Sequence, residues 1–337
     1  MVRLSELVKK SKKGDVKQRE KVMIKVNEIR KVLQNPSDIK KIYEDSIRQI
    51  EKIMKDLQKD KKADGKIIMN LAETIVEKLH IKHEVFLSLV NDYNLYKHES
   101  EFMYIHSLNV AILSVNLGIS LGYNKKELID LCASALVHDI GMLKTSQEII
   151  TKPGRLTFEE FEQVKQHPYN GLELLKKITD MPPIASEVII QHHEKFNGKG
   201  YPEGKKGKEI SKYAQIVGIA EVYEALTHVR PYRNNRIIPF EAVKIIVQEE
   251  NDSFYPGLLK AFLNYVSFYP IGSYVKLNSD EIGKVVSVNK KIPLRPVIEV
   301  IQNSDGSPVE EKRQIDLAKS PFLYIEKALD ENESLAE

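Results

Sequence analysis

Cysteine is nearly absent from this sequence, with a single residue, Cys132, among 337. One cysteine excludes an intrachain disulfide and is typical of proteins in a reducing compartment. Long apolar runs are also missing. No stretch of about 18 consecutive apolar residues occurs, so we expect no transmembrane helix. The first fifteen residues lack the apolar segment of a secretory signal peptide, and we therefore expect a cytoplasmic protein.

Positive charge, by contrast, is concentrated near the N-terminus. Residues 1–66 hold 20 lysines and arginines against 11 acidic residues. A basic segment can bind nucleic acid or anionic lipid. A nucleic-acid surface would have basic residues interleaved with aromatic ones. Here the basic residues alternate with acids instead. We therefore expect a solvated helical face and no nucleic-acid polymer as a partner.

Hydrophobic spacing predicts a mainly α protein in three parts. Apolar residues recur at helical spacing in most of residues 3–265, including 66–79, 82–92, 101–121 and 126–137. After about residue 266, β-branched residues cluster between turn residues and predict four short strands. We expect an N-terminal helical segment over 1–65 that could be regulatory or form a homodimer, a helical domain over 66–265, and a small β-barrel-like domain over 266–337.

Five short motifs place histidines or acidic residues in apolar helical surroundings. They centre on His106, His138-Asp139, His167, His192-His193 and Glu221. A lone histidine on an apolar helix is usually a hydrogen-bonded core residue, and a His–Asp neighbour pair can simply bond to itself. An ionised carboxylate buried without partners costs several kcal/mol, however. Repetition of the pattern therefore favours metal coordination.

The predicted ends of helices place several of these residues at bends. His138-Asp139 is expected to end a helix with Gly141 as its C-cap. The Thr157–Glu160 stretch has the pattern of a capping box that starts a helix. Pro168 must interrupt or restart that helix, so His167 should lie at a bend.

The stretch HHEKFNGKGYPEG, residues 192–204, joins two histidines to a glycine-rich loop. Its glycines and Pro202 exclude a helix over residues 197–202. We expect this loop to present Tyr201 to a ligand.

Taken in order, these motifs and the following RPYR resemble the HD-GYP family, a branch of the HD-domain metal phosphohydrolases. The resemblance covers roughly residues 66–265. It implies an all-helical HD-type core and a site for two or three metal ions, usually iron or manganese. It also implies hydrolysis of the bacterial messenger cyclic di-GMP.

The resemblance assigns a role to each matching residue. Those that match the ligands of the first metal are His106, His138, Asp139 and Glu221. Those that match the ligands of the second are His167, His192 and His193, with Asp139 as the bridging, catalytic carboxylate. Those that match the substrate-binding residues are Gly200, Tyr201, Pro202, Arg230 and Arg233. Two such ions would lower the pKa of a bridging water.

Three departures from the family pattern affect these expectations. Glu221 stands where the family usually has aspartate, which lengthens the carboxylate by one methylene. Phe102 stands where three-metal members have a carboxylate, so we expect two divalent ions, iron or alternatively manganese. Met142 replaces a frequent lysine, and Lys144 is the candidate to take over its catalytic role.

We therefore expect a cyclic di-GMP phosphodiesterase that releases linear pGpG, GMP or both. One alternative is a weak or inactive cyclic di-GMP sensor, which Met142 and Glu221 favour. Another is an HD phosphohydrolase for a different nucleotide, which the Tyr201 loop disfavours.

Overall fold

The computed structural model describes residues 36–90, 102–228, 237–248, 251–289 and 291–329. The chain divides into a unit of residues 1–44 and a larger compact unit of residues 45–337. The seven predicted metal ligands all lie in the larger unit. The helix predicted within residues 3–33, and both Arg230 and Arg233, lie outside the described residues.

Two apolar helices form the centre of the helical part, α5 (Phe102–Ser120) and α6 (Lys125–Leu136). α5 is buried on all faces, from Tyr104 to Gly118. By length and composition α5 could cross a membrane, but 83% of its apolar window is buried inside the protein, as in a core helix. α6 begins at a capping box in which Asn124 and Glu127 satisfy each other's backbone N–H groups.

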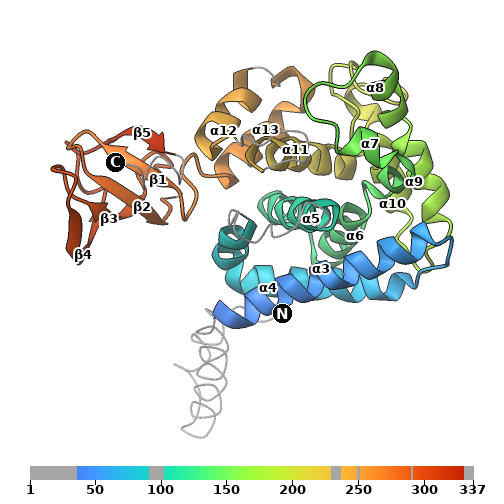
Figure 1. Cartoon of the computed structure of the whole chain (residues 1–337), viewed down its shortest axis with the longest axis horizontal. Coiled ribbons are helices and arrows are strands. Elements are labelled where there is room, and N and C mark those ends of the chain that lie inside the picture. Colours follow the sequence, from blue (N-terminus) through green and yellow to red (C-terminus); the bar gives the residue numbers. More distant parts are fainter. Residues whose placement is uncertain (1–35, 91–101, 229–236, 249–250, 290, 330–337) are drawn as a thin grey trace, which may run out of the picture. The chain divides into compact units, whose positions relative to one another are not determined.

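Longer helices cover this centre on two sides. α4 (Gly65–Val90) packs against α5 and α6, and α11 (Lys212–Thr227) packs against the other side of α5 (Figure 1). α4 is one continuous helix where the spacing suggested two segments, because no glycine or proline interrupts residues 79–82. The remaining long helices are α3 (Pro36–Gln58), α12 (Pro239–Gln248) and α13 (Pro256–Tyr265).

Along the chain, short helices connect α6 to α11. They are η3 (Ile140–Lys144), α7 (Gln147–Ile150), α8 (Phe158–Val164), α9 (His167–Leu175), α10 (Ile184–Gln191), η4 (Gly207–Glu209) and, before α13, η5 (Asn251–Ser253). The predicted capping box of Thr157 and Glu160 starts α8. The predicted break at Pro168 is also confirmed, because α8 ends at Val164 and a new helix, α9, begins at His167.

Gly141 does not have the role that its position suggested. α6 ends at Leu136 with Val137 as its C-cap, and Gly141 lies inside η3. A Cβ atom on Gly141 would lie 1.8 Å from the carbonyl oxygen of His167. Glycine is therefore needed here for the close approach of η3 to α9, which brings Asp139 near His167, rather than for ending a helix.

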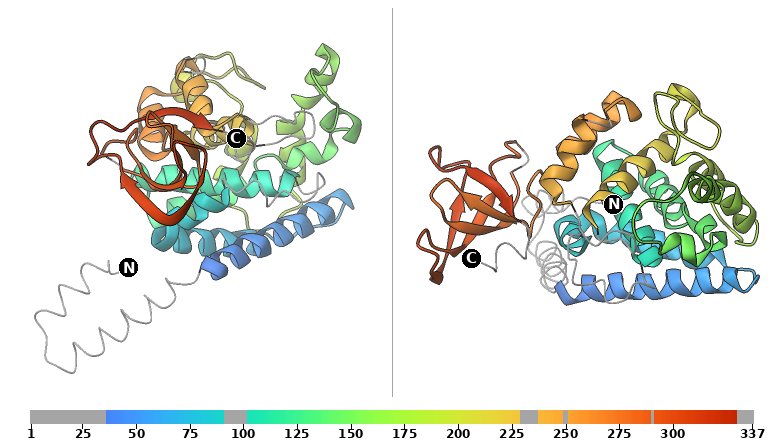
Figure 2. Two further views of the ribbon diagram at one scale, coloured as in Figure 1. Left: turned by 60° about the vertical axis from the view of Figure 1, so that its left-hand side comes forward. Right: turned by 45° about the horizontal axis from the view of Figure 1, so that its top comes forward.

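Five antiparallel strands form a sheet in the order β4-β3-β2-β1-β5. Figure 2 shows this sheet in orange and red. The strands are β1 (Tyr274–Leu277), β2 (Ile282–Ser287), β3 (Val297–Gln302), β4 (Pro308–Asp316) and β5 (Ile325–Leu329). The four predicted strands are present. The fifth strand, β5, was not predicted because it has no run of β-branched residues. This order leaves β4 and β5 at the edges, so the described strands form an antiparallel sheet, and its closure into a barrel stays a prediction.

Candidate metal centre

Three histidines follow the ends of three helices and make the same backbone contact. In each, ring Nδ1 faces a carbonyl oxygen three residues earlier. The pairs are His138 with Ala135 at 2.7 Å, His167 with Val164 at 2.8 Å, and His192 with Ile189 at 2.9 Å. A carbonyl only accepts, so Nδ1 carries the proton and the lone pair of a neutral ring is on Nε2. Each ring thus caps the end of α6, α8 or α10 and directs a ligand atom away from it.

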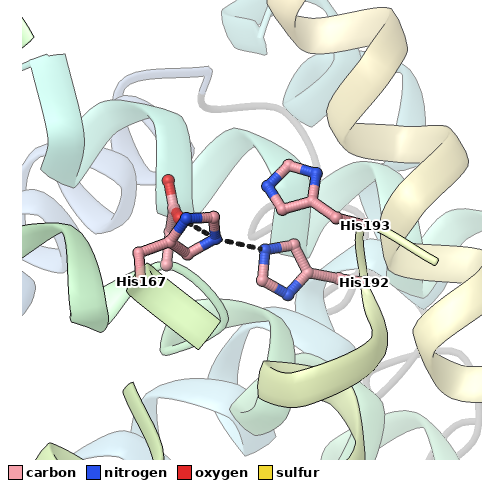
Figure 3. Close-up of side chains that lie close together, drawn as sticks. His167, His192 and His193 are labelled. Carbon is pink, nitrogen blue, oxygen red and sulfur yellow. Dashed lines mark hydrogen bonds and ion pairs between the residues drawn. The ribbon is translucent and has the colours of Figure 1, made fainter. Parts of the chain in front are cut away.

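These lone pairs point toward one another. Nε2 of His167 and Nε2 of His192 are 3.2 Å apart, with His193 beside them (Figure 3). Two lone pairs at this distance repel unless a proton or a cation lies between them. Nε2 of His138 is buried and has no hydrogen-bond partner in the described structure. A buried nitrogen without a partner is costly, and a metal ion would remove that cost.

Asp139 joins the two sets of histidines. Its Oδ1 lies 3.3 Å from Nε2 of His167, and its Oδ2 lies 3.8 Å from Nε2 of His106. Despite this proximity, Oδ1 makes no hydrogen bond with acceptable geometry to any described group. A carboxylate facing several imidazole lone pairs is suited to bridging two cations.

His106 is held by a carboxylate that the sequence reasoning missed. Glu224, three residues after Glu221 on α11, is fully buried, and its Oε2 lies 2.6 Å from Nδ1 of His106. This contact places the His106 proton on Nδ1 and leaves Nε2 facing Asp139. Carboxylate–histidine pairs of this kind orient metal ligands and raise their basicity. The sequence did contain a signal for Glu224, because it is a second acidic residue in the apolar run that surrounds Glu221.

The same carboxylate belongs to a buried polar network. Asn109 Nδ2 lies 3.5 Å from Glu224 Oε1 and 3.4 Å from Nε2 of His228. His228 Nε2 in turn lies 2.7 Å from the carbonyl oxygen of Val90 at the end of α4. The network therefore connects α5, α11 and α4 behind His106 and fixes the orientation of that ring.

Glu221 and His193 complete the cluster from the side of α11. Oε1 of Glu221 lies 3.5 Å from Nε2 of His193. Ligand atoms of Glu221, His138 and His192 also lie within 4.8 Å of one another. The resemblance assigned Glu221 to the first ion only, whereas the structure places its carboxylate between members of both sets.

Burial keeps three of these histidines in the form that binds metal. It lowers the pKa of His138 to about 4, and it lowers the pKa values of His192 and His193 well below the ordinary value. These rings are neutral at pH 7, as coordination requires. Burial opposes ionisation of Asp139, but the neighbouring imidazoles outweigh it and lower the pKa of that carboxyl group. The site thus combines neutral imidazoles with an ionised carboxylate.

All seven predicted ligands therefore converge in one place. The groups whose ligand atoms lie within 4.8 Å of one another are Asp139 with His167, His192 and His193; His106 with His138 and Asp139; and His138 with His192 and Glu221. Mixed nitrogen and oxygen donors of this kind suit iron, manganese or zinc. The partnerless atoms of His138 and Asp139 show that the residues fit a bound metal.

Aromatic side chains stand at the edge of the cluster. The ring of Tyr201 stacks on His193 with centroids 4.5 Å apart, and Phe161 meets Tyr201 edge-on at 6.3 Å. Gly200 allows this arrangement, because a Cβ atom there would lie 2.4 Å from the carbonyl oxygen of His193. Burial, aided by the charges of Glu221 and Asp139, raises the pKa of Tyr201, so its hydroxyl keeps a proton to donate.

Two predicted functional positions near Asp139 are not part of the cluster. Lys144 forms an ion pair with Glu173 of α9, on the protein surface. Met142 lies in η3, and its sulfur accepts a weak hydrogen bond from Thr145 at 3.8 Å. The catalytic role of Lys144 remains a prediction, and its ion pair does not favour it.

Known proteins resemble this chain over most of its length. Residues 48–257 match the family described as the HD domain, and residues 274–336 match the KOW domain associated with HD domain. The cyclic di-GMP phosphodiesterase PA4108 of Pseudomonas aeruginosa is 30% identical over 226 residues, which are 66% of this chain and 54% of that protein. The chain thus spans about half the length of this relative.

A second relative bears a different substrate in its name. The 3'3'-cGAMP-specific phosphodiesterase 1 of Vibrio cholerae is 37% identical over 142 residues, covering 42% of this chain and 33% of that protein. Among solved structures, Bd1817, an HDG"Y"P protein from Bdellovibrio bacteriovorus, matches with a TM-score of 0.53 at 20% identity. The matched region covers 66% of this chain and 69% of the Bd1817 chain. The fold, the family match and the ordered ligand motifs together show that this chain belongs to the HD-domain family, in its HD-GYP branch.

Proposed function

We propose that this protein is a metal-dependent phosphodiesterase that hydrolyses cyclic di-GMP to linear pGpG, GMP or both. The observation that carries the proposal is the convergence of seven ligand side chains. Within that cluster, buried atoms of His138 and Asp139 have no hydrogen-bond partner among the described residues. A purely structural cluster would leave these atoms unsatisfied at a cost of about 1–3 kcal/mol each.

The cluster would hold two divalent transition-metal ions, iron or alternatively manganese. Such ions activate water and stabilise charge on both the attacking and leaving oxygens of a phosphodiester. The protein contributes rings held in one tautomer and a carboxylate shared between the two ligand sets. The hydrogen bonds from Nδ1 to backbone carbonyls leave the rings of His138, His167 and His192 little freedom to rotate. Their ligand atoms are therefore in position before any ion binds.

Substrate recognition would involve the aromatic edge of the site. Phe161 is 42% exposed and lies next to Tyr201, so a base could stack on it while the Tyr201 hydroxyl donates to a phosphate. Gly200 and Pro202 would shape this loop. Arg230 and Arg233, which lie outside the described residues, would bind the phosphates as the family resemblance implies.

The test is a comparison of substrates on metal-loaded protein. Protein purified without oxygen would be analysed for iron and manganese and then incubated with cyclic di-GMP, 3'3'-cGAMP and cyclic di-AMP, with products separated by chromatography. We expect about two ions per chain and fastest loss of cyclic di-GMP. Asp139→Asn should lose both metal and turnover, whereas Asp130→Asn, which changes a carboxylate of α6 that pairs with Lys126, should lose neither. Two ions bound with no cleavage of any substrate would replace this proposal with that of a sensor.

A second candidate substrate is 3'3'-cGAMP, because a relative named for it is 37% identical over 142 residues. Both dinucleotides contain a guanine and two phosphodiesters, and the described residues of the site read neither base specifically. The measurement is kcat/KM for each of the two dinucleotides. The substrate whose kcat/KM is more than about ten times that of the other is the preferred one.

Three further proposals complete the assignment. The N-terminal segment over residues 1–65 would regulate the catalytic domain over residues 66–265 or mediate a homodimer. The sheet over residues 266–337 would close toward a small barrel and contact a partner or shield the site. The single cysteine supports a cytoplasmic location.

A further inference from the structure

The helical domain contains a cavity away from the metal cluster, and none of the residues that line it is a predicted metal ligand. Its volume is about 650 Å³, within the range of small-molecule sites. It is enclosed by the end of α5, the loop after α10, and the first turns of α11 and α13. The lining residues with distinctive chemistry are Tyr123, Phe196, Lys208, Lys212, Gln215 and Tyr255.

Aromatic rings form two walls of this cavity. Tyr123 lies against Tyr213 with centroids 5.5 Å apart, and Phe196 lies against Tyr255 at 5.8 Å. Tyr255 is 53% exposed, so much of its side chain remains accessible to a ligand. A planar ring that entered between these pairs would replace water on apolar surfaces and stack on them.

Two exposed lysines give the cavity a positive charge. Neither Lys208 nor Lys212 forms an ion pair with a carboxylate among the described residues. The neighbouring acid, Glu209, instead accepts a hydrogen bond from the backbone N–H of Lys206 at 3.0 Å. The cavity therefore offers two free ammonium groups beside aromatic walls, which is the pairing that a phosphorylated aromatic compound requires.

The cavity also shares a wall with the loop that carries Tyr201. The backbone N–H of Phe196 donates to Ser253, and its carbonyl accepts from Gly207, so Phe196 is held at both sides. The two ends of the Tyr201 loop thus meet at this cavity, whereas Tyr201 itself lies against His193 at the metal cluster. A ligand here would not contact the metal ligands.

We propose that this cavity is a binding site for a mononucleotide, whose base stacks between Tyr123 and Tyr255 and whose phosphate binds Lys208 and Lys212. Its volume suits one nucleotide, and its charge complements a phosphate. This site is separate from the proposed catalytic one, and its occupancy can be measured without any turnover.

The test measures binding of GMP to the full-length, metal-free protein by isothermal titration calorimetry. We expect one GMP per chain, with guanosine and inorganic phosphate each binding at least tenfold more weakly, because each has only half of the required chemistry. Lys208→Ala/Lys212→Ala should weaken GMP binding at least tenfold. Tyr255→Ala should weaken it about fivefold or more.

Two matched controls separate this site from other surfaces. Lys176→Ala/Lys260→Ala removes the same charge from exposed positions outside the cavity and should leave the affinity unchanged. Tyr201→Ala should also leave it unchanged, because that ring lies at the metal cluster. Absence of GMP binding at millimolar concentration overturns the proposal. So does equal affinity of the parent and the Lys208→Ala/Lys212→Ala protein, or a loss caused by Tyr201→Ala.

Discussion

Replacement of Glu224 tests whether the metal centre depends on its supporting carboxylate. Glu224→Gln keeps the shape of the side chain and an oxygen that can accept from Nδ1 of His106, but it removes the negative charge. The 2.6 Å contact is buried, so water cannot replace that charge. Loss of such supporting groups usually lowers metal affinity or activity by 10–100-fold, which is about 1.4–2.7 kcal/mol. We expect about tenfold weaker metal binding for Glu224→Gln.

Glu224→Ala should have a larger effect, because it leaves the His106 N–H and the amide of Asn109 without this partner. We expect metal affinity to fall about a hundredfold and the unfolding free energy to fall by about 1–3 kcal/mol. The assay is competition for the metal with a chelator of known affinity, alongside turnover at saturating metal. Glu73→Gln, an exposed position on α4, is the control. Parent-like affinity in Glu224→Gln would refute the idea that this charge supports His106.

Three further predictions concern stability, substrate binding and turnover. The pKa of His138 is about 4 in the folded protein and about 6.5 when unfolded, so the unfolded chain binds the extra proton. Urea unfolding of metal-free protein should thus show stability falling from pH 7 toward 4, with roughly 3 kcal/mol of that fall contributed by His138 and missing in His138→Gln. Phe161→Ala should raise KM about tenfold, and Phe158→Ala should not. Met142→Lys should raise kcat, by up to 10²–10⁴-fold if the new lysine acts as an acid whose role is otherwise lost. If Lys144 already has that role, Lys144→Ala should instead lower kcat strongly and Met142→Lys should change it little.

Local sequence signals predicted the helices that position the ligands. The capping box of Thr157 and Glu160 and the break at Pro168 both depend on neighbours within a few residues, and both are present. The order of the strands in the sheet and the role of Gly141 were not predictable in this way. They depend on contacts between segments far apart in the chain, such as that of Gly141 with the backbone of His167.

The candidate ligands could be named from their order in the sequence, but their grouping could not. Glu221 and Glu224 are both acids on one apolar helix, three residues apart. Only the packing of the helices decides that Glu221 faces His193, whereas Glu224 faces Nδ1 of His106. The other ring nitrogen of His106, Nε2, faces Asp139. Phe161 was missed for a related reason, since an aromatic residue on a short amphipathic helix gives no sign of which distant loop it will meet.

The capping of three helices by histidines also affects the order in which the site fills. The C-terminal ends of α6, α8 and α10 meet at the cluster, and each carries a partial negative charge from its last carbonyl groups. Asp139 and Glu221 add full negative charges in the same place. Without ions, this electrostatic potential repels a phosphodiester; with two divalent cations bound, it attracts one. Cation binding should therefore precede binding of the dinucleotide, and the metal-free protein should have little affinity for the substrate at this site.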